Sequence, residues 1–222
     1  VVSAVVYYGN ILRSVKISEE LYRELKKSSD TIKTNAEGTI RAMALTVEMR
    51  DPYTAGHQRQ VAVLASAIAG EMGIPREQID SIHLAGMIHD IGKVQIPTEI
   101  LSKYGKLTEL EFDMIKTHSQ AGYDILKTIE FQWPVAEFVL QHHERMGGSG
   151  YPSGLSGNNI HIEARILSVA DVVDAMIPHR PYRPTLGIDK ALEELSNSRG
   201  IRYDSNVVDA YLSIITEKNV WT

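Results

Sequence analysis

The sequence predicts an all-α fold. Apolar residues recur every three or four positions through most of the chain, and capping residues and glycines stand at the ends of these segments. Beyond the first 17 residues, no segment has the alternating pattern of a strand. A chain of 222 residues is long enough for one large domain with a short appendage.

The composition excludes several classes of protein. There is no cysteine, so disulfides are impossible and any metal site must use nitrogen and oxygen ligands. A net charge of -5 gives no electrostatic footprint for duplex nucleic acid. No run approaches 18 uncharged apolar residues, so the sequence predicts no membrane span. The chain begins with Val1, and we expect it to be a fragment of a longer protein with a sensor domain upstream.

The N-terminal segment reads differently from the rest. Apolar runs on either side of Gly9-Asn10 suggest two short strands within residues 1–17, and the frayed end of a helix is the alternative. From Ser18 to about Arg50, apolar residues recur at helical spacing. We expect residues 1–35 to be a linker or the remnant of an upstream domain, and residues 36–222 to be the functional domain.

Helices follow one another through that domain. Pro75 suits the first turn of one helix, and Thr108 with Glu111 has the capping-box pattern at the start of another. Asp204 is a candidate N-cap for the last helix, and the glycine-rich segment 146–159 must be a loop. The helices are expected at about 53–72, 75–92, 97–101, 108–126, 134–143, 163–176, 189–196 and 205–215, with Gly73 and Gly92 ending the first two.

Imidazoles and carboxylates lie on the apolar faces and at the ends of these helices. His57, for example, shares a stripe with Val61 and Ile68. Buried groups of this kind are usually paired or bound to a metal. Seven of them form the candidate ligand set: His57, His89, Asp90, His118, His142, His143 and Asp171. Asp174, one turn after Asp171, is expected to orient a ligand imidazole.

Seven ligands exceed the needs of one first-row ion that also holds water and substrate. They suit two divalent ions bridged by one carboxylate. An all nitrogen and oxygen set favours iron or manganese, with zinc, nickel and cobalt as possible occupants in vitro. Two such ions would clamp a phosphoryl group and activate water, so the chemistry expected is metal-dependent phosphodiester hydrolysis.

The sequence resembles the HD-GYP family of the HD phosphohydrolase superfamily, over roughly residues 38–217. The resemblance rests on His89-Asp90-Ile91-Gly92-Lys93, on Ile96-Pro97, on His142-His143-Glu144-Arg145 and on Gly148-Ser149-Gly150-Tyr151-Pro152. It implies a helical bundle around a dinuclear centre and hydrolysis of cyclic di-GMP to pGpG and, in a further step, GMP. By position, the seven candidate ligands match those of the family, with Asp90 as the bridge.

The resemblance also assigns substrate contacts. Lys93 matches a lysine that contacts the scissile phosphate. Asp90 and Lys93 are the expected catalytic residues. Tyr151 lines the ligand site, and Arg180 and Arg183 match basic residues that hold the dinucleotide. Guanidinium groups suit phosphate and base recognition.

Two positions depart from the family pattern. Gly147 replaces an Asp or Asn, which puts full activity in doubt. Some members of the family have, four residues before the first ligand histidine, a Glu that helps to bind a third metal ion. This chain has Tyr53 there, so two metal ions are expected.

Alternatives remain open at this stage. The substrate of the enzyme could be another cyclic dinucleotide, such as cyclic GMP-AMP, and the domain could instead be a catalytically weak cyclic di-GMP receptor. We expect a cytoplasmic domain, with membrane tethering of the full-length protein left open. The periodicity from Leu21 to Val47 allows a homodimer through the N-terminal helix.

Overall fold

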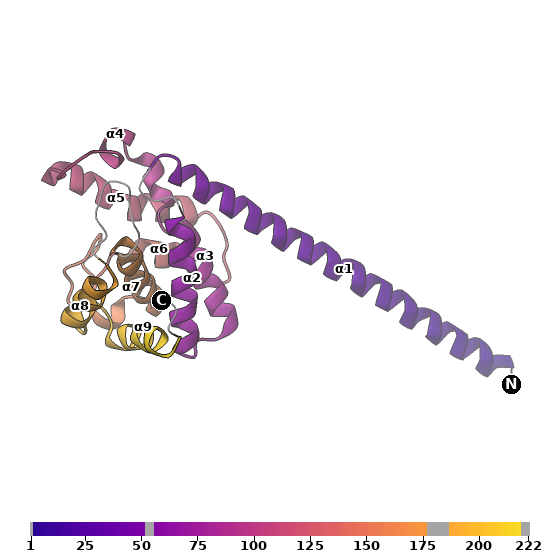
Figure 1. Ribbon diagram of the computed structural model, residues 1–222. Coiled ribbons are helices and arrows are strands. Elements are labelled where there is room, and N and C mark those ends of the chain that lie inside the picture. The colour runs from indigo at the N-terminus through magenta and orange to yellow at the C-terminus, as the bar shows by residue number, and fades with distance from the viewer. Residues whose placement is uncertain (1, 52–55, 177–186, 219–222) are drawn as a thin grey trace. The chain divides into compact units, whose positions relative to one another are not determined.

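The computed structural model describes residues 2–51, 56–176 and 187–218 (Figure 1). Every regular element in these residues is a helix, which confirms the predicted all-α class. The chain divides into two compact units, Val1–Ala42 and Met43–Thr222. None of the helices in the described ranges is both long and apolar enough to cross a lipid bilayer.

The helices follow the order expected from the sequence. They are α1 (Val2–Glu48), α2 (His57–Glu71), α3 (Arg76–Ile88), the 3₁₀ helix η1 (Ile91–Gln95), α4 (Thr98–Leu101), α5 (Glu109–Leu126), α6 (Val135–Gln141), the 3₁₀ helix η2 (Gly157–Asn159), α7 (Ile162–Met176), α8 (Ile188–Ser198) and α9 (Ser205–Lys218). From α4 onward, most of the expected bounds lie within one or two residues of these.

The two strands expected before residue 18 are wrong, and the alternative of a helix is confirmed. The helix α1 runs without interruption through Gly9 and Gly38. A two-stranded hairpin without a third strand or a covering helix is marginal in water. Helical spacing of apolar residues, by contrast, continues from Val15 past Ile32, and the helix follows that longer pattern.

Two of the expected helix ends need correction. The helix expected from Tyr53 or Thr54 begins at His57, since Gly56 has φ 78° and lies in the left-handed region; residues 52–55 lie outside the described ranges. The next helix, α3, ends at Ile88, and Gly92 lies within η1 and does not terminate α3. A Cβ at Gly92 would lie 1.9 Å from the carbonyl oxygen of His118, so this glycine permits close approach of η1 to α5.

The core of the larger unit forms around α2, which packs against α3, α7 and α9. One face of α2 is fully buried, including Val61, Ala65 and Ile68. Gly86 of α3 lies against Ala62, and a Cβ there would come within 2.6 Å of the Ala62 Cα atom. This close packing fixes α2 relative to α3. Candidate ligands lie at the start of α2 (His57) and directly after the end of α3 (His89 and Asp90).

The predicted capping box at the start of α5 is confirmed. The Thr108 hydroxyl accepts a hydrogen bond from the Glu111 backbone N–H, and the Glu111 carboxylate accepts one from the Thr108 N–H. Lys103 also donates to this carboxylate at 2.7 Å. These bonds satisfy N–H groups that would otherwise be unpaired at the helix end. They anchor the helix that carries His118.

Candidate metal centre

Seven side chains from five helices of the larger unit converge in one buried cluster. His57 begins α2, His89 and Asp90 follow α3, His118 lies on α5, His142 and His143 follow α6, and Asp171 lies on α7. In three overlapping groups, His57-His89-Asp171, His89-Asp90-His142 and His118-His142-His143, the donor atoms lie within 4.8 Å of one another. These groups together contain the seven candidate ligands named from the sequence.

Three of the imidazoles are held in the same tautomer by their own helices. The Nδ1 atoms of His89, His118 and His142 lie 2.8, 2.7 and 2.5 Å from the backbone carbonyl oxygens three residues earlier. A carbonyl can only accept, so each Nδ1 carries the proton and each Nε2 keeps a lone pair. Burial lowers the pKa of His142 to about 3 and that of His118 below its ordinary value. Both rings are therefore neutral donors.

The lone pairs of these rings fit a cation. The Nε2 atom of His89 is buried and has no hydrogen-bond partner in the described residues. The Nε2 atoms of His118 and His142 face each other at 3.3 Å. Two lone pairs at this distance repel unless a positive group lies between or beside them. The buried donor set therefore suits divalent metal ions, as neutral imidazole and carboxylate donors do.

Two carboxylates lie among the imidazoles. Asp90 is 3% exposed, and its oxygens lie 3.5 Å from the His118 Nε2 atom and 3.6 Å from that of His89. Asp171 lies 3.2 Å from the His57 Nε2 atom and 3.9 Å from the His143 Nδ1 atom. Burial raises the pKa of Asp90, but the positive charge of Lys93 lowers it more, so that the group stays ionised.

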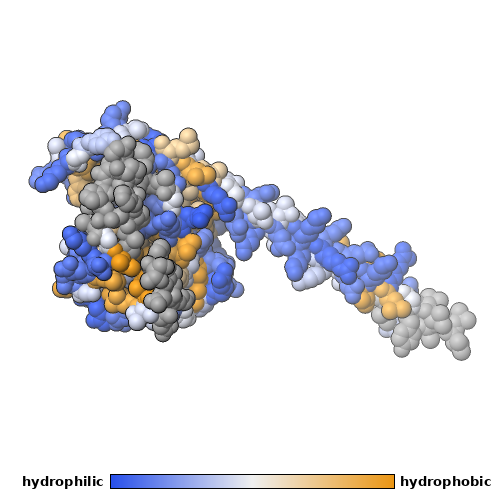
Figure 2. Space-filling model, viewed as in Figure 1, coloured by the Kyte–Doolittle hydropathy of each residue, from blue (hydrophilic) through white to orange (hydrophobic). Residues whose placement is uncertain are grey.

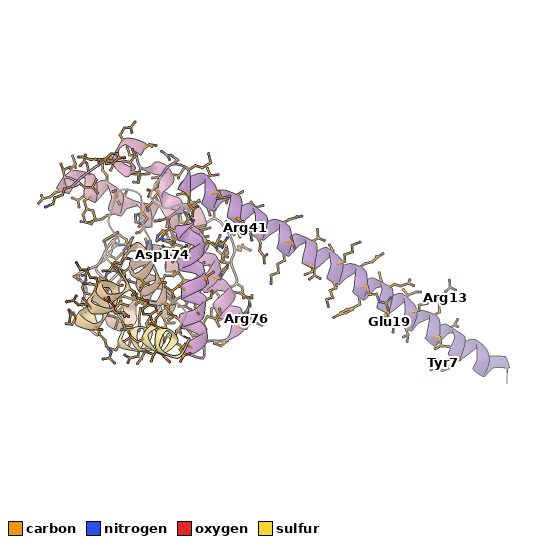
Figure 3. All side chains as sticks on the ribbon, viewed as in Figure 1. Tyr7, Arg13, Glu19, Arg41, Arg76 and Asp174 are labelled. Atoms are coloured by element: carbon orange, nitrogen blue, oxygen red, sulfur yellow. The ribbon has the colours of Figure 1, made fainter. Side chains whose placement is uncertain are left out.

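Asp174 holds His57 as the sequence predicted. Its Oδ2 atom lies 2.6 Å from the His57 Nδ1 atom, and the aspartate is 8% exposed. Asp174 is labelled on the larger unit in Figure 3. Burial disfavours the charged imidazolium, but the hydrogen bonds to Asp171 and Asp174 outweigh it and raise the pKa of His57 to about 9. A carboxylate behind a ligand imidazole fixes the ring and increases its basicity.

Lys93 points into the same cluster from η1. Its Nζ atom lies 2.7 Å from Asp90 and 3.2 Å from Asp51. Burial lowers the pKa of Lys93, but these two carboxylates raise it above its ordinary value, so the ammonium stays charged. Arg50 donates to the carbonyl oxygens of Val94 and Ile96, which ties the end of α1 to η1. The sequence offered no signal for this use of Arg50 and Asp51, because the pairing joins segments more than 40 residues apart.

Tyr151 lies over the His143 side of the cluster. The two ring centroids are 4.7 Å apart, and the Tyr151 ring is 6.5 Å from that of His118. An open hollow of ≈ 420 Å³ adjoins Tyr151 and is lined on its other side by α5 residues that include Thr117 and Gln120, next to His118. The tyrosine therefore stands between the cluster and a space at the surface.

Glu144 fixes the loop that carries Tyr151. It is 2% exposed, and its two carboxylate oxygens accept hydrogen bonds from the backbone N–H groups of Ser153 at 2.7 Å and Leu155 at 2.9 Å. Gly150 lets the loop pass close, because a Cβ there would lie 2.4 Å from the Glu144 Cα atom. Glu144 belongs to the motif His142-His143-Glu144-Arg145, but its role was not predicted from the sequence. A buried acid next to two ligand histidines was the available signal.

Gly147, which departs from the family pattern, lies at the edge of this loop. It forms an isolated bridge with Ser156, and a Cβ there would come within 3.0 Å of the Ile201 carbonyl oxygen. Three other predicted positions, Tyr53, Arg180 and Arg183, lie outside the described residues. Their roles as third-metal position and dinucleotide contacts remain predictions.

Comparisons with known proteins identify the family of this chain. The model of the HD domain family matches residues 41–207. The chain is 38% identical, over 86% of its length and 51% of the relative's, to the cyclic di-GMP phosphodiesterase response regulator RpfG of Xanthomonas campestris. It is 38% identical, over 75% of its length and 39% of the relative's, to the 3'3'-cGAMP-specific phosphodiesterase 1 of Vibrio cholerae.

A solved structure shares the fold. Bd1817, an HDGYP-type protein of Bdellovibrio bacteriovorus, superposes with a TM-score of 0.60 at 20% identity, over 72% of this chain and 51% of that one. The chain spans about half the length, or less, of the relatives described here. With the family match over most of its length and the motif from His142 to Pro152 in place, the chain belongs to the HD domain family, as a member of its HD-GYP group.

Proposed function

We propose that this chain is the catalytic domain of a metal-dependent phosphodiesterase that hydrolyses cyclic di-GMP to pGpG and then GMP. The observation that carries the proposal is the buried cluster of five imidazoles and two carboxylates with the Lys93 ammonium directly beside Asp90. A purely structural helical domain would have no use for so many buried polar donors, because leaving them unpaired is costly. Relatives that act on cyclic dinucleotides support the same conclusion.

The residues would hold two divalent ions, with Asp90 as the bridge and iron or manganese as the expected metals. When bound, such ions supply Lewis acidity for the phosphoryl oxygens and lower the pKa of an attacking water. The protein's own part is to hold three neutral rings with their Nε2 atoms inward, which His89, His118 and His142 do through the carbonyl oxygens of their helices.

Lys93 is the proposed electrostatic catalyst. The Lys93 side chain is 15% exposed, and its ammonium is paired with Asp90 and Asp51. In such a partly desolvated site, a charge interacts more strongly than it does in water. We propose that it stabilises the negative charge that develops on the phosphoryl oxygens during in-line attack of water. Tyr151 would line the substrate beside the adjoining hollow, and Arg180 and Arg183 would contact the dinucleotide.

Two alternatives are distinguished by experiment. Cyclic GMP-AMP is the alternative substrate, favoured by the similarity to a cGAMP-specific relative. Competition between the two nucleotides in one reaction gives the preference directly. A catalytically weak receptor for cyclic di-GMP is the second alternative, and the glycine at position 147 is the observation that favours it. Tight nucleotide binding without product would establish the receptor.

The test of the proposed function is the Asp90→Ala variant. We expect turnover of cyclic di-GMP to fall to background and metal content, measured by elemental analysis on protein purified without oxygen, to fall with it. Asp80→Ala is the matched control, because Asp80 lies on α3, the helix that Asp90 follows, is exposed and pairs only with Arg76 in the described contacts. An Asp90→Ala protein that kept two metals and its rate would refute the assignment.

We further propose that the domain is cytoplasmic, that it follows an upstream sensor domain in the full-length protein, and that it forms a homodimer through α1. The relative that is named a response regulator supports the sensor, since this chain matches 51% of that protein. The proposed dimer can be tested without reference to activity, as described next.

A further inference from the structure

The helix α1 is buried only near its C-terminal end, where Ala44 and Val47 are 3 and 2% exposed. Every described side chain from Leu12 to Thr39 is exposed, including large apolar ones. Val15, Tyr22, Leu25 and Ile32 are 50, 68, 70 and 66% exposed. Helix stability in proteins comes mostly from tertiary packing of an apolar face. The stretch from Leu12 to Thr39 has no buried side chain, so its apolar face calls for a partner.

Four of the exposed apolar side chains form one stripe, whereas Leu12 and Ile17, 70 and 48% exposed, lie off it at positions e and c of a heptad repeat. The spacing of seven, three and seven residues within the stripe assigns Val15 and Tyr22 to position a of this repeat, and Leu25 and Ile32 to position d. Ser18 and Ser29 occupy d and a positions between them. Leu21 adjoins the stripe at a flanking g position.

The opposite side of the helix is polar. Arg13, Glu20, Lys27 and Arg41 occupy position f, farthest from the stripe. Arg13 and Arg41 are labelled on α1 in Figure 3, and Figure 2 shows a face of α1 on which hydrophilic residues predominate. One apolar stripe against one polar face fits a two-stranded coiled coil and not a helix enclosed on all sides.

We propose that α1 pairs with α1 of a second copy of this chain in a parallel, in-register coiled coil, with Val15, Ser18, Tyr22, Leu25, Ser29 and Ile32 as its seam. This refines the homodimer under the proposed function and does not depend on the phosphodiesterase activity. In register, every seam residue meets its own copy, so apolar layers match apolar layers. A shift by one heptad would set Ser18 against Leu25 and Tyr22 against Ser29, which leaves hydroxyls opposite apolar side chains.

The flanking positions bring no repulsion to this register. In a parallel pair, each g residue lies near the e residue five positions later in the other chain. The neighbours are then Leu21 with Lys26 and Ser28 with Lys33, and no like charges meet. Lysine stems can cover the edge of the apolar stripe while their ammonium groups remain in water. The second copy therefore meets a surface that suits its own.

The absence of cysteine allows a direct test on the whole chain. Leu25→Cys and Ile32→Cys place single thiols in the seam. Arg23→Cys and Asp30→Cys, both at position b, are matched controls on the same turns. All four positions are exposed, so folding is not at risk. Under mild oxidation, we expect both seam variants to form disulfide-linked dimers about tenfold faster than the controls, because a disulfide requires Cβ atoms in close contact.

The direction and register of the two helices are determined by comparing each cysteine variant alone with a mixture of the Leu25→Cys and Ile32→Cys proteins. Cross-links within the Leu25→Cys sample and within the Ile32→Cys sample support the parallel register. Cross-links that form only between the two variants would indicate an antiparallel or shifted pair and overturn the proposal. Equal rates at seam and control positions, or a monomer by light scattering of the unsubstituted chain, would also overturn it. None of these outcomes bears on whether Asp90 is required for hydrolysis, so the two proposals fail separately.

Discussion

Replacing Glu144 by Gln should loosen the loop that carries Tyr151. The carboxylate accepts from the N–H groups of Ser153 and Leu155, one on each oxygen. Gln has nearly the same shape but offers only one acceptor oxygen. Its amide NH₂ group would face a backbone N–H that has lost its partner. The substitution therefore tests the hydrogen bonds with almost no change in packing.

The magnitude follows from the burial of this group. A hydrogen bond to a charged partner contributes about 1.5–3 kcal/mol, and a buried donor left unpaired costs a similar amount. Glu144 is 2% exposed, so water cannot replace the lost acceptor fully. We expect Glu144→Gln to destabilise the closed loop by about 2–3 kcal/mol. A loss of about 2 kcal/mol raises the open population roughly 30-fold.

Two measurements check this expectation. Hydrogen exchange at the Ser153 and Leu155 amides should accelerate by the factor given above, and the KM for cyclic di-GMP should rise more than kcat falls, because Tyr151 is no longer held beside His143. Glu130→Gln, at an exposed position, is the control and should change neither. If both amides exchanged in the Glu144→Gln variant as slowly as in the wild type, the role given to Glu144 would be refuted, because other contacts would then hold the loop.

Three further predictions concern the framework of the site. Gly92→Ala should lower stability by about 1–3 kcal/mol or more and reduce activity, because its Cβ would lie 1.9 Å from the His118 carbonyl oxygen; Gly70→Ala, a helical position with nothing within 4 Å, should be neutral or stabilising by urea denaturation. Hydrogen bonds from Lys103 and Thr108 lower the pKa of Glu111 from 4.5 to about 2, so its contribution to stability is present above pH 4.5 and lost as the pH falls toward 2. The difference in melting temperature between wild type and Glu111→Gln should therefore be largest near neutral pH and shrink below pH 4.5; a difference that persists near pH 2 would contradict this. Chelation should lower the melting temperature and abolish turnover, and adding iron or manganese should restore both, because the metal binds the folded site and stabilises it; a melting temperature unaffected by chelation would count against a resident metal.

The parts of this structure that the sequence predicted are the local ones. The capping box at Thr108 and Glu111 depends on residues only three apart in the chain. The partnership of Asp51 with Lys93, by contrast, depends on how two distant segments meet. The strands expected before residue 18 were wrong because a four-residue apolar run fits either a strand or a helix. Only the longer spacing from Val15 to Ile32 distinguishes the two.

Four of the candidate ligand histidines are oriented by hydrogen bonds of two kinds. His89, His118 and His142 take their proton positions from backbone carbonyl oxygens, which no side-chain substitution can remove. His57 takes its orientation from the Asp174 side chain at 2.6 Å. The three backbone-held rings give the protein a constant set of donors, inherited from helix geometry alone. Asp174 is thus the side chain whose substitution is expected to alter the electron donation of His57, while the three backbone-held rings keep their orientation.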